Sequence, residues 1–402
     1  MLSRSEIATR WAATFSIGFR PFFLLGALAG AVLILVWILF LRGMTDLPPQ
    51  MHPLLWHGRE MLFGFIGAVI VGFVLTAAGN WTGLATTRPT QLLGLVLLWL
   101  VARLGFLFPQ AIPLVLSSVT DLLLFPLVAL LLGRVLLASR NRRNYAFLPF
   151  FAALTLLNAT NHLSLHGLIP FAWGLRSLDA TVLLVTVLLV FMGGRVIPFF
   201  TDRRLPDVKV RQSVVLNWSA TLATLACAVV VLLFGRHAMG GPLLLLASVL
   251  NLIRWACWQP QKTLGDALLW VLHFGYLWIC IGLALLGLHL FGAPINWSAG
   301  SHALTVGAMG LLVIGMMARV SLGHTGRPLQ APPLGIAAFV AISGAAVLRL
   351  LWGFIPQAQG LLAVAGIFWV LGFALFLLAY ADTLTRPRPD EHGTTVRAGK
   401  SG

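Results

Sequence analysis

The chain has 402 residues, of which 59% are hydrophobic and 9% are charged, and its mean hydropathy is +0.94. Soluble domains carry about a quarter charged residues, so this composition excludes a water-soluble enzyme and indicates an integral membrane protein. Lys and Arg number 27 against 11 Asp and Glu, which makes the net charge +16. No basic face interleaved with aromatic residues accompanies this excess, so we expect no nucleic-acid partner.

Long apolar runs follow one another along almost the whole chain. A helix needs about 20 apolar residues to cross the hydrocarbon core of a lipid bilayer. Because lipid cannot hydrogen-bond to backbone groups, and the runs are too long for barrel strands, they predict α-helices. We therefore expect an all-α, polytopic integral membrane protein with a single transmembrane domain at 1–385, built from about 12 transmembrane helices. The predicted spans are residues 19–41, 57–79, 90–108, 112–138, 145–165, 174–200, 214–234, 242–258, 266–291, 300–321, 331–354 and 358–383.

The basic residues predict the direction in which the spans cross the membrane. Nine of the 27 fall inside the spans, and alternate loops carry the other 18 as 16 against 2. Cytoplasmic loops carry the excess of Lys and Arg, so the N- and C-termini are both predicted to be cytoplasmic. The first apolar run is too long for a signal-peptide core, and we expect it to be retained. The segment 386–402, rich in Pro, Gly and charge, is predicted to be a disordered cytoplasmic tail.

Most of the histidines lie at or near the predicted extracytoplasmic ends of the spans. A neutral imidazole is the commonest metal ligand, so this accumulation indicates a metal or haem centre near the outer face. His162 and His166 are four residues apart on one predicted helix, a spacing that suits either a shared metal ion or a hydrogen-bonded polar helix end. His57 and His302 are the other metal-ligand candidates. Solvation in loops is the better explanation of the remaining three, His52, His237 and His289.

His57 opens the second predicted span in the segment WHGREMLFG. Glu60 follows at i+3 and Met61 at i+4, so we expect all three on one helix face. A carboxylate beside a ligating imidazole orients that ligand, which makes Glu60 a candidate second-layer residue together with Arg59. An interfacial belt with a snorkelling arginine is the alternative explanation of the same residues.

A second polar set is predicted at the cytoplasmic ends of the spans. Arginine at a helix end can hold propionate or phosphate oxygens, and a histidine on an apolar helix can be an axial haem ligand. The alternatives are positive-inside snorkelling for the arginines and a core histidine bonded to a neighbouring helix. The set consists of Asn80, Trp81, Arg195, His273, Arg319 and His324.

Two acidic residues inside predicted spans need partners, because an uncompensated charge in the membrane is costly. Arg103, at the outer end of the third span, is expected to meet Asp121 of the fourth. Arg176 precedes Asp179 by three residues on the sixth span. We interpret both as structural ion pairs.

The order and positions of several segments together resemble the NnrS family of bacterial inner-membrane proteins, and the resemblance extends almost from end to end. The segments are FRPFFLLGAL at 19–28, WHGREMLFGF at 56–65, GFVLTAAGNWTG at 72–83, LLWLVARL at 97–104, GGRVIPFFT at 193–201, LLWVLHFGYLW at 268–278, HALTVGAMG at 302–310 and ARVSLGHTGRPL at 318–329.

The resemblance implies a multi-pass protein of the bacterial inner (cytoplasmic) membrane that contains haem b and copper. Its implied ligand is nitric oxide or a related small molecule, with an electron donor that the sequence does not identify. The implied role is nitric oxide metabolism or protection from nitrosative stress in denitrifying or NO-exposed bacteria. By the resemblance, the recurring polar positions of the family are occupied here by His57, Glu60, Asn80, Trp81, Arg195, His273, His302, Arg319 and His324, with His57, His273 and His302 as haem or copper ligands.

The chain departs from the family pattern at one position. The family motif in the second span usually reads WHxHE, and this chain has Arg59 where the second histidine would stand. If that histidine is a ligand in relatives, this protein lacks one coordination position of the copper site. Arg59 could instead hold a carboxylate or a propionate.

Two roles linked to nitric oxide are open at this point: a redox enzyme that consumes it, and a sensor or metal-protecting protein without turnover. The hypothesis from a different class is a 12-helix transporter for a metal, haem or small anion without redox chemistry. Its support is the number of spans and the polar groups at both faces. Half-helix breaks and midplane charges, which many transporters use, are not obvious apart from Asp121.

Overall fold

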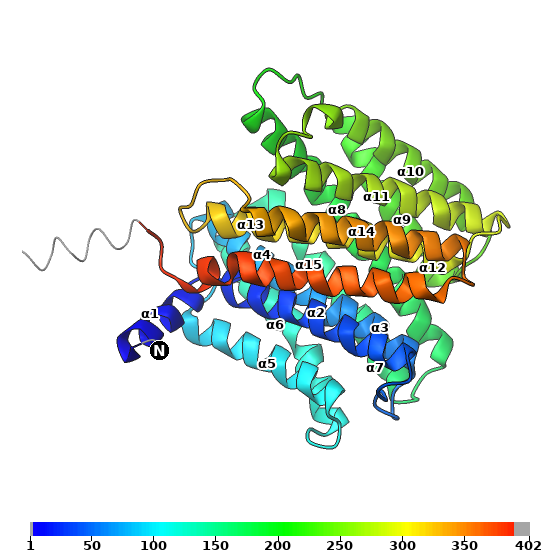
Figure 1. Cartoon of the computed structure of the whole chain (residues 1–402), viewed down its shortest axis with the longest axis horizontal. Coiled ribbons are helices and arrows are strands. Elements are labelled where there is room, and N and C mark those ends of the chain that lie inside the picture. Colours follow the sequence, from blue (N-terminus) through cyan, green and yellow to red (C-terminus); the bar gives the residue numbers. More distant parts are fainter. Residues whose placement is uncertain (1–2, 390–402) are drawn as a thin grey trace, which may run out of the picture. The chain divides into compact units, whose positions relative to one another are not determined.

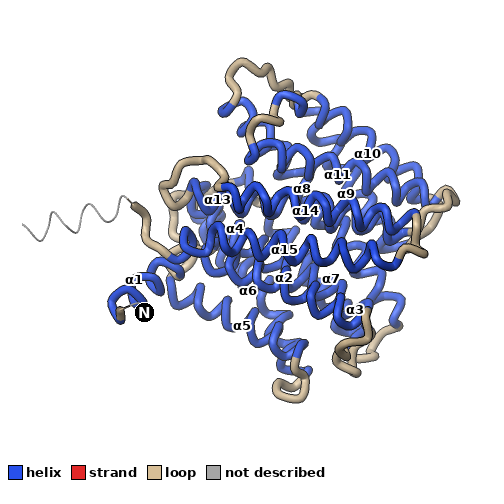
Figure 2. Tube along the Cα trace, viewed as in Figure 1, coloured by secondary structure: helices blue, strands red, loops and turns tan. Residues whose placement is uncertain are grey.

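The computed structural model describes residues 3–389, and every regular element within them is a helix (Figures 1 and 2). The predicted all-α fold is confirmed. Most of the predicted tail, residues 390–402, lies outside the described residues. The chain divides into two compact units, so the single domain at 1–385 stays a prediction. Unit 1 comprises the residues up to His166, Met317–Gly335 and the residues from Ala374 onward, and unit 2 comprises Gly167–Met316 and Ile336–Phe373.

Unit 1 is built mainly from the N-terminal helices. Helix α2 packs against α4, α4 against α6, and α6 against both α5 and α7. The elements are α1 (Arg4–Thr14), α2 (Phe19–Leu41), α3 (Pro53–Arg59), the π-helix η1 (Glu60–Ile66), α4 (Gly67–Thr82), α5 (Pro89–Leu107), α6 (Leu114–Ala138), the 3₁₀ turn η2 (Arg142–Asn144) and α7 (Phe147–Leu165).

Unit 2 is centred on α11, which packs against α8, α10, α12 and η4. Helices α13 and α15 each begin in unit 2 and end in unit 1. The elements are α8 (Phe171–Arg204), α9 (Val214–Phe234), α10 (Gly240–Ala256), the 3₁₀ turn η3 (Pro260–Lys262), α11 (Ala267–Leu290), α12 (Trp297–His302), the π-helix η4 (Ala303–Met309), α13 (Gly310–Gly323), α14 (Pro333–Phe354) and α15 (Gln359–Thr385).

Each of the twelve predicted spans coincides with a helical segment, and 10 of these segments in the described part of the chain are long and apolar enough to cross a membrane. The other two are α7, which carries Asn158, Asn161 and His162, and α10, a shorter apolar helix that carries Asn251 and Arg254. Polar side chains that face a protein interior lower the mean hydropathy of a helix without exposing it to water. The count of twelve spans and the cytoplasmic termini stay predictions.

Two of the membrane-crossing segments contain a π-helical stretch, which plain apolar patterns do not reveal. The first, η1, follows α3 and begins at Glu60; the second, η4, begins directly after His302. A π-helix widens the turn, shifts the faces of the residues after it and is frequent at functional sites. In this chain each π-helix begins within three residues of a candidate ligand, His57 or His302.

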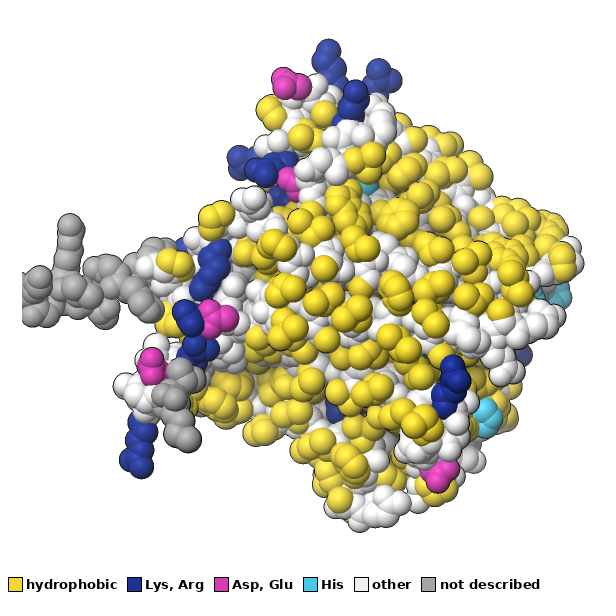
Figure 3. All heavy atoms as spheres, in the orientation of Figure 1, with side chains coloured by type: hydrophobic (Ala, Val, Ile, Leu, Met, Phe, Trp, Pro, Cys, Tyr) yellow, Lys and Arg dark blue, Asp and Glu magenta, His cyan; other side chains and the backbone are white. Residues whose placement is uncertain are grey.

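The outer faces of the helices match a lipid surrounding. On α2, Leu28, Val32 and Leu35 are exposed at helical spacing, while Phe22 and Phe23 are buried. Hydrophobic side chains predominate on the face shown in Figure 3. Lipid solvates such side chains as well as a protein core does, so association of these helices rests on close packing and polar contacts.

Close packing of α2 against α4 predicts the effect of one substitution. A Cβ atom on Gly72 would lie 2.7 Å from Cβ of Phe22 and 3.3 Å from Cα of Phe19. We expect Gly72→Val to destabilise the protein by about 1–3 kcal/mol through overpacking, measured as a lower melting temperature in detergent. Gly94→Val on α5 is the matched control, because nothing lies within 4 Å of its Cβ position. Equal losses in the two variants would contradict this role for Gly72.

Candidate functional site

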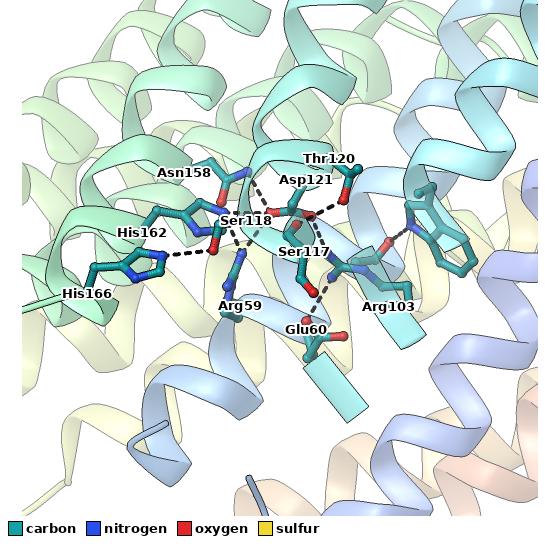
Figure 4. A network of polar contacts seen from close by, with 12 residues as sticks. Arg59, Glu60, Arg103, Ser117, Ser118, Thr120, Asp121, Asn158, His162 and His166 are labelled. Atoms are coloured by element: carbon teal, nitrogen blue, oxygen red, sulfur yellow. Dashed lines mark hydrogen bonds and ion pairs between the residues drawn. The ribbon is translucent and has the colours of Figure 1, made fainter. Parts of the chain in front are cut away.

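Four charged side chains meet inside unit 1 (Figure 4). Arg59 ends α3, Glu60 begins η1, Arg103 lies on α5 and Asp121 lies on α6. Their relative exposures are 0%, 0%, 4% and 2%, so none of them has access to bulk water. Charges this deep persist only when they pair with one another.

Asp121 is the centre of this ionic network. Arg59 donates from Nη2 to Oδ2 of Asp121 at 2.7 Å, and Asn158 of α7 donates from Nδ2 to the same oxygen at 2.9 Å. Arg103 donates from Nη2 to Oδ1. His162 Nε2 lies 3.0 Å from Oδ2. The predicted pairing of Arg103 with Asp121 is therefore confirmed, and Arg59 holds a carboxylate, as the departure from the WHxHE motif had suggested.

Glu60 joins the network through Arg103, whose Nη1 donates to Oε1 of Glu60 at 2.9 Å. Gly64 makes this approach possible, because a Cβ there would overlap the Arg103 guanidinium. Trp99 of α5 donates its Nε1 hydrogen to the Gly64 carbonyl at 3.0 Å, inside the π-helical stretch. The network therefore fixes the position of η1 against α5.

The two histidines that the sequence paired by spacing have different partners. His162 is buried, and its Nε2 lies 2.7 Å from Arg59 Nη2 as well as close to Asp121. His166 is exposed, and its Nε2 lies 2.9 Å from the Ser118 hydroxyl of α6. Figure 4 shows the two residues at the end of α7, where His162 lies in the last turn and His166 directly follows the helix. The arrangement is that of a hydrogen-bonded helix end, and shared metal binding by the pair stays a prediction.

His57 of α3 contacts α2. Its ring stacks on Trp37 of α2 with centroids 4.4 Å apart and an angle of 18° between the planes. His324, another candidate ligand of unit 1, lies 5.8 Å from the ring of Phe19 at the other end of α2. The helical rise separates Phe19 from Trp37 by roughly 27 Å, so one metal cannot take both histidines.

In unit 2 the candidate ligand His273 is buried between α8 and α10. Its Nε2 lies 2.9 Å from the Thr201 hydroxyl, and that hydroxyl donates to the Ile197 carbonyl at 2.9 Å. Since the hydroxyl has a single hydrogen, it accepts the Nε2 hydrogen of His273, which places the ring's lone pair on Nδ1. Within the described residues, Nδ1 is buried and has no hydrogen-bond partner. The Trp258 ring packs edge-on with its centroid 6.4 Å from that of His273.

Around His273 the segments GGRVIPFFT and LLWVLHFGYLW converge with α10. Tyr276, one turn after His273, donates to Oδ1 of Asn251 at 2.5 Å, and Asn251 contacts the Thr224 hydroxyl of α9 at 3.3 Å. Arg254 of α10 is 2% exposed and donates from Nη2 to the Val190 carbonyl at 2.9 Å. Four helices thus contribute polar side chains to one buried cluster.

His302 ends α12, and its Nδ1 atom lies near three groups, one of which is the Ser298 hydroxyl at 3.2 Å. The Ser298 carbonyl lies 2.9 Å away and Arg349 Nη2 of α14 lies 3.0 Å away. Gly300 packs against Leu286 of α11, which is about 20 Å along the helix from His273. Two candidate ligands of unit 2 therefore lie near opposite ends of α11.

Among the remaining predicted residues, Asn80 and Trp81 lie in the last turn of α4. The prediction that Arg195 ends its helix is wrong, because α8 continues to Arg204. Arg195 places its guanidinium 4.0 Å from the Phe191 ring, Asn80 is exposed, and Trp81 stacks obliquely on Phe147. Arg319 is 9% exposed within α13. His324 follows α13, where burial and the charge of Arg388 lower its pKa.

The predicted partner of Asp179 needs correction. Arg236, in the loop after α9, donates from Nε to Oδ2 of Asp179 at 3.0 Å, and Trp297 donates from Nε1 to Oδ1 at 2.9 Å. Arg176 instead lies with its guanidinium 5.2 Å from the Trp173 ring. Proximity in sequence favoured Arg176, but helix packing presents Arg236 to the carboxylate.

No group of three or more His, Cys, Asp or Glu side chains in residues 3–389 is placed to hold a metal ion. A copper centre made of three protein side chains is therefore not preformed in the described chain. A haem needs only one or two protein ligands, because the macrocycle supplies the other four nitrogens. A haem therefore requires only one buried imidazole such as that of His273, whereas a copper centre requires several ligands close together.

Several residues of both clusters were not singled out by the sequence analysis. Asn158 and Thr201 are ordinary polar residues in apolar helices and give no distinctive signal. Arg254 did give a signal, because it lies inside the apolar run of α10, three residues after Asn251. An arginine in lipid is costly unless it has polar partners. Arg349, inside α14, gave the same signal.

An all-helical chain with membrane-length apolar helices and buried polar clusters is a multi-pass membrane protein. The chain belongs to the NnrS family, because the family model described as NnrS protein matches residues 13–388. No curated protein matches the chain. The family membership that the sequence motifs indicated is thereby confirmed.

The ionic network predicts a stability effect for Asp121. Asp121→Asn leaves two buried arginines without their common charge, so we expect a loss of about 3–5 kcal/mol, measured by chemical unfolding in mixed micelles. Asp382→Asn is the control in unit 1, because Asp382 is 55% exposed and pairs with Arg10, and its loss should stay below about 1 kcal/mol. Similar losses for both variants would show that the network does not stabilise unit 1.

Proposed function

We propose that the protein is a haem-binding protein of the bacterial inner membrane that acts in nitric oxide metabolism or protection from nitrosative stress. Family membership supports the biological role. The observation that carries the cofactor assignment is the buried Nδ1 atom of His273, which has no partner among the described residues. A buried nitrogen with an unused lone pair is costly unless a ligand or metal completes it.

The residues around His273 fit a haem b ligand. Thr201 accepts the Nε2 hydrogen and so orients the ring, as hydrogen-bonded partners orient metal-binding histidines elsewhere. Trp258 packs against the ring and Trp255 donates from Nε1 to the His273 carbonyl at 2.8 Å, which holds the helix position. These contacts keep water away from the imidazole and preserve its neutral, metal-binding form.

A bound haem, held by His273, would supply an iron able to bind nitric oxide. Copper is the second metal that the family implies, and we propose His57 of unit 1 and His302 of unit 2 as two separate candidate ligands for it. Arg59 stands where the family motif WHxHE has its second histidine, and its side chain donates a hydrogen bond to Asp121. We therefore propose that iron is the principal metal of this member.

The visible spectrum of the detergent-purified protein tests this proposal directly. From haem-replete cells we expect a Soret band that shifts on reduction with dithionite and again on addition of nitric oxide. Elemental analysis should give iron in at least equal amount to the protein, with less copper than iron. A colourless, iron-free protein would overturn the proposal and favour the transporter hypothesis, with the same polar residues lining a pathway.

Substitutions at His273 and Thr201 test the ligand assignment. We expect His273→Ala to lower haem affinity more than tenfold, and Thr201→Val, which keeps the shape but loses the hydroxyl, to lower it by about 10-fold. Haem content is measured by pyridine haemochrome on protein that elutes as a single peak. His237→Ala is the control, because His237 is exposed in the loop before α10. If His273→Ala retains its full haem content, the assignment of His273 as the haem ligand is wrong and another histidine holds the haem.

A further inference from the structure

Arg254 is a buried cation for which the described residues provide no negatively charged partner. Its side chain is 2% exposed on α10, donates a hydrogen bond to the Val190 carbonyl and lies within reach of the neutral Tyr276 hydroxyl. Its Nε and Nη1 atoms are buried, and no partner for them exists among residues 3–389. A buried guanidinium without a counter-charge costs several kcal/mol, far more than a neutral residue of the same size.

The fold makes room for this guanidinium. A Cβ on Gly194 of α8 would overlap it, and a Cβ on Gly193 would lie 3.1 Å from the Tyr276 ring. The Trp258 and Tyr276 rings lie with centroids 5.3 Å and 5.8 Å from the Arg254 guanidinium carbon. Arg254 and Tyr276 therefore pack directly against Gly194 and Gly193, at the start of GGRVIPFFT, where a larger side chain would not fit.

The polar groups near Arg254 are neutral. Tyr276 uses its hydroxyl hydrogen on Asn251, and Asn251 donates to Thr224 and to the Ala247 carbonyl. His273, which shares the Trp258 ring with Arg254, also has a buried nitrogen without a partner in the described chain. Arg254 and His273, which both lie near the Trp258 ring, together have three buried nitrogen atoms without a hydrogen-bond partner in the described chain.

Unit 1 shows how the same chain neutralises a buried arginine. Arg59 and Arg103 are as deeply buried as Arg254, and Asp121 and Glu60 supply carboxylates at hydrogen-bonding distance. Unit 2 places no ion-pairing carboxylate beside Arg254 within the described residues. The negative charge that completes this site is therefore expected from outside the chain.

We propose that Arg254 is the binding residue of a buried oxyanion site in unit 2, with Gly194 as its floor and Trp258 as its wall. The ligand is a single small carboxylate-like group, because guanidinium N–H groups match such oxygens and aromatic rings confine the space. Two sources have this chemistry: a free inorganic or organic monovalent oxyanion, and a carboxylate arm of a bound cofactor. The second source rests on the proposed haem function, and the first does not.

The first arm uses protein prepared without haem in HEPES buffer, titrated with sodium nitrite or sodium formate at constant ionic strength. We expect a saturable rise in melting temperature, and a binding isotherm by calorimetry that sodium perchlorate does not reproduce. Arg254→Met should weaken binding by about 10- to 100-fold, the loss of a hydrogen bond to a charged group. Arg204→Met is the control, because Arg204 is half exposed and already paired with Asp266.

The second arm compares haem-loaded with haem-free protein. If a cofactor carboxylate occupies the site, loaded protein no longer responds to nitrite or formate, and Arg254→Met lowers haem content while Arg204→Met does not. If a free anion occupies it, both forms respond alike. Arg254→Lys, which keeps a cation but loses the planar fork, should give intermediate affinity and serves if Arg254→Met does not fold.

The proposal is overturned if wild-type protein and Arg254→Met or Arg254→Lys respond identically to the anions and retain the same haem content. Arg254 would then be a structural cation stabilised by Trp258 and Tyr276 alone. A protein that never binds haem but shows the Arg254-dependent response would refute the proposed function and leave the anion site standing.

Discussion

Two guanidinium groups converge on the carboxylate of Asp121 inside unit 1, where neither lipid nor water can replace it. This contact joins α3, α5 and α6, and Asn158 and His162 add α7 to the same oxygen atoms. Apolar side chains cannot specify which helices pair, because lipid solvates them equally well. The charged groups can, since any other pairing leaves a buried charge unmatched. The position of η1, and of His57 just before it, follows from this network.

Unit 2 has the same kind of polar interior with a different balance of charge. His273 and Arg254 are held by neutral groups, and each keeps nitrogen atoms without partners in the described chain. Both clusters contain buried side-chain atoms without a hydrogen-bond partner among the described residues, but only the unit 1 network pairs its arginines with carboxylates. The difference in charge compensation supports a structural role for the cluster around Asp121 and agrees with the binding role proposed for the cluster around Trp258. It also places the proposed haem ligand and the proposed oxyanion site within one set of helices.

Much of this organisation was predictable from residue patterns. The apolar runs predicted helices at the correct positions, and the pairing of Arg103 with Asp121 followed from antiparallel neighbours. Asp179 shows the limit of such reasoning, because its partner Arg236 lies 57 residues away and is brought near only by packing. The π-helices at Glu60 and Ala303 were not predictable either, since a π-turn leaves the apolar composition unchanged.

The sequence by itself determined that this is a multi-pass, all-helical membrane protein of the NnrS family, because hydropathy and motif order are properties of the chain alone. Only the tertiary structure decided which buried polar groups satisfy one another. Arg59 and Arg254 have the same charge and are both buried, yet one meets a carboxylate and the other does not. The physical reason is that charge compensation depends on distances of about 3 Å between helices far apart in the sequence, which side-chain packing sets and local composition does not.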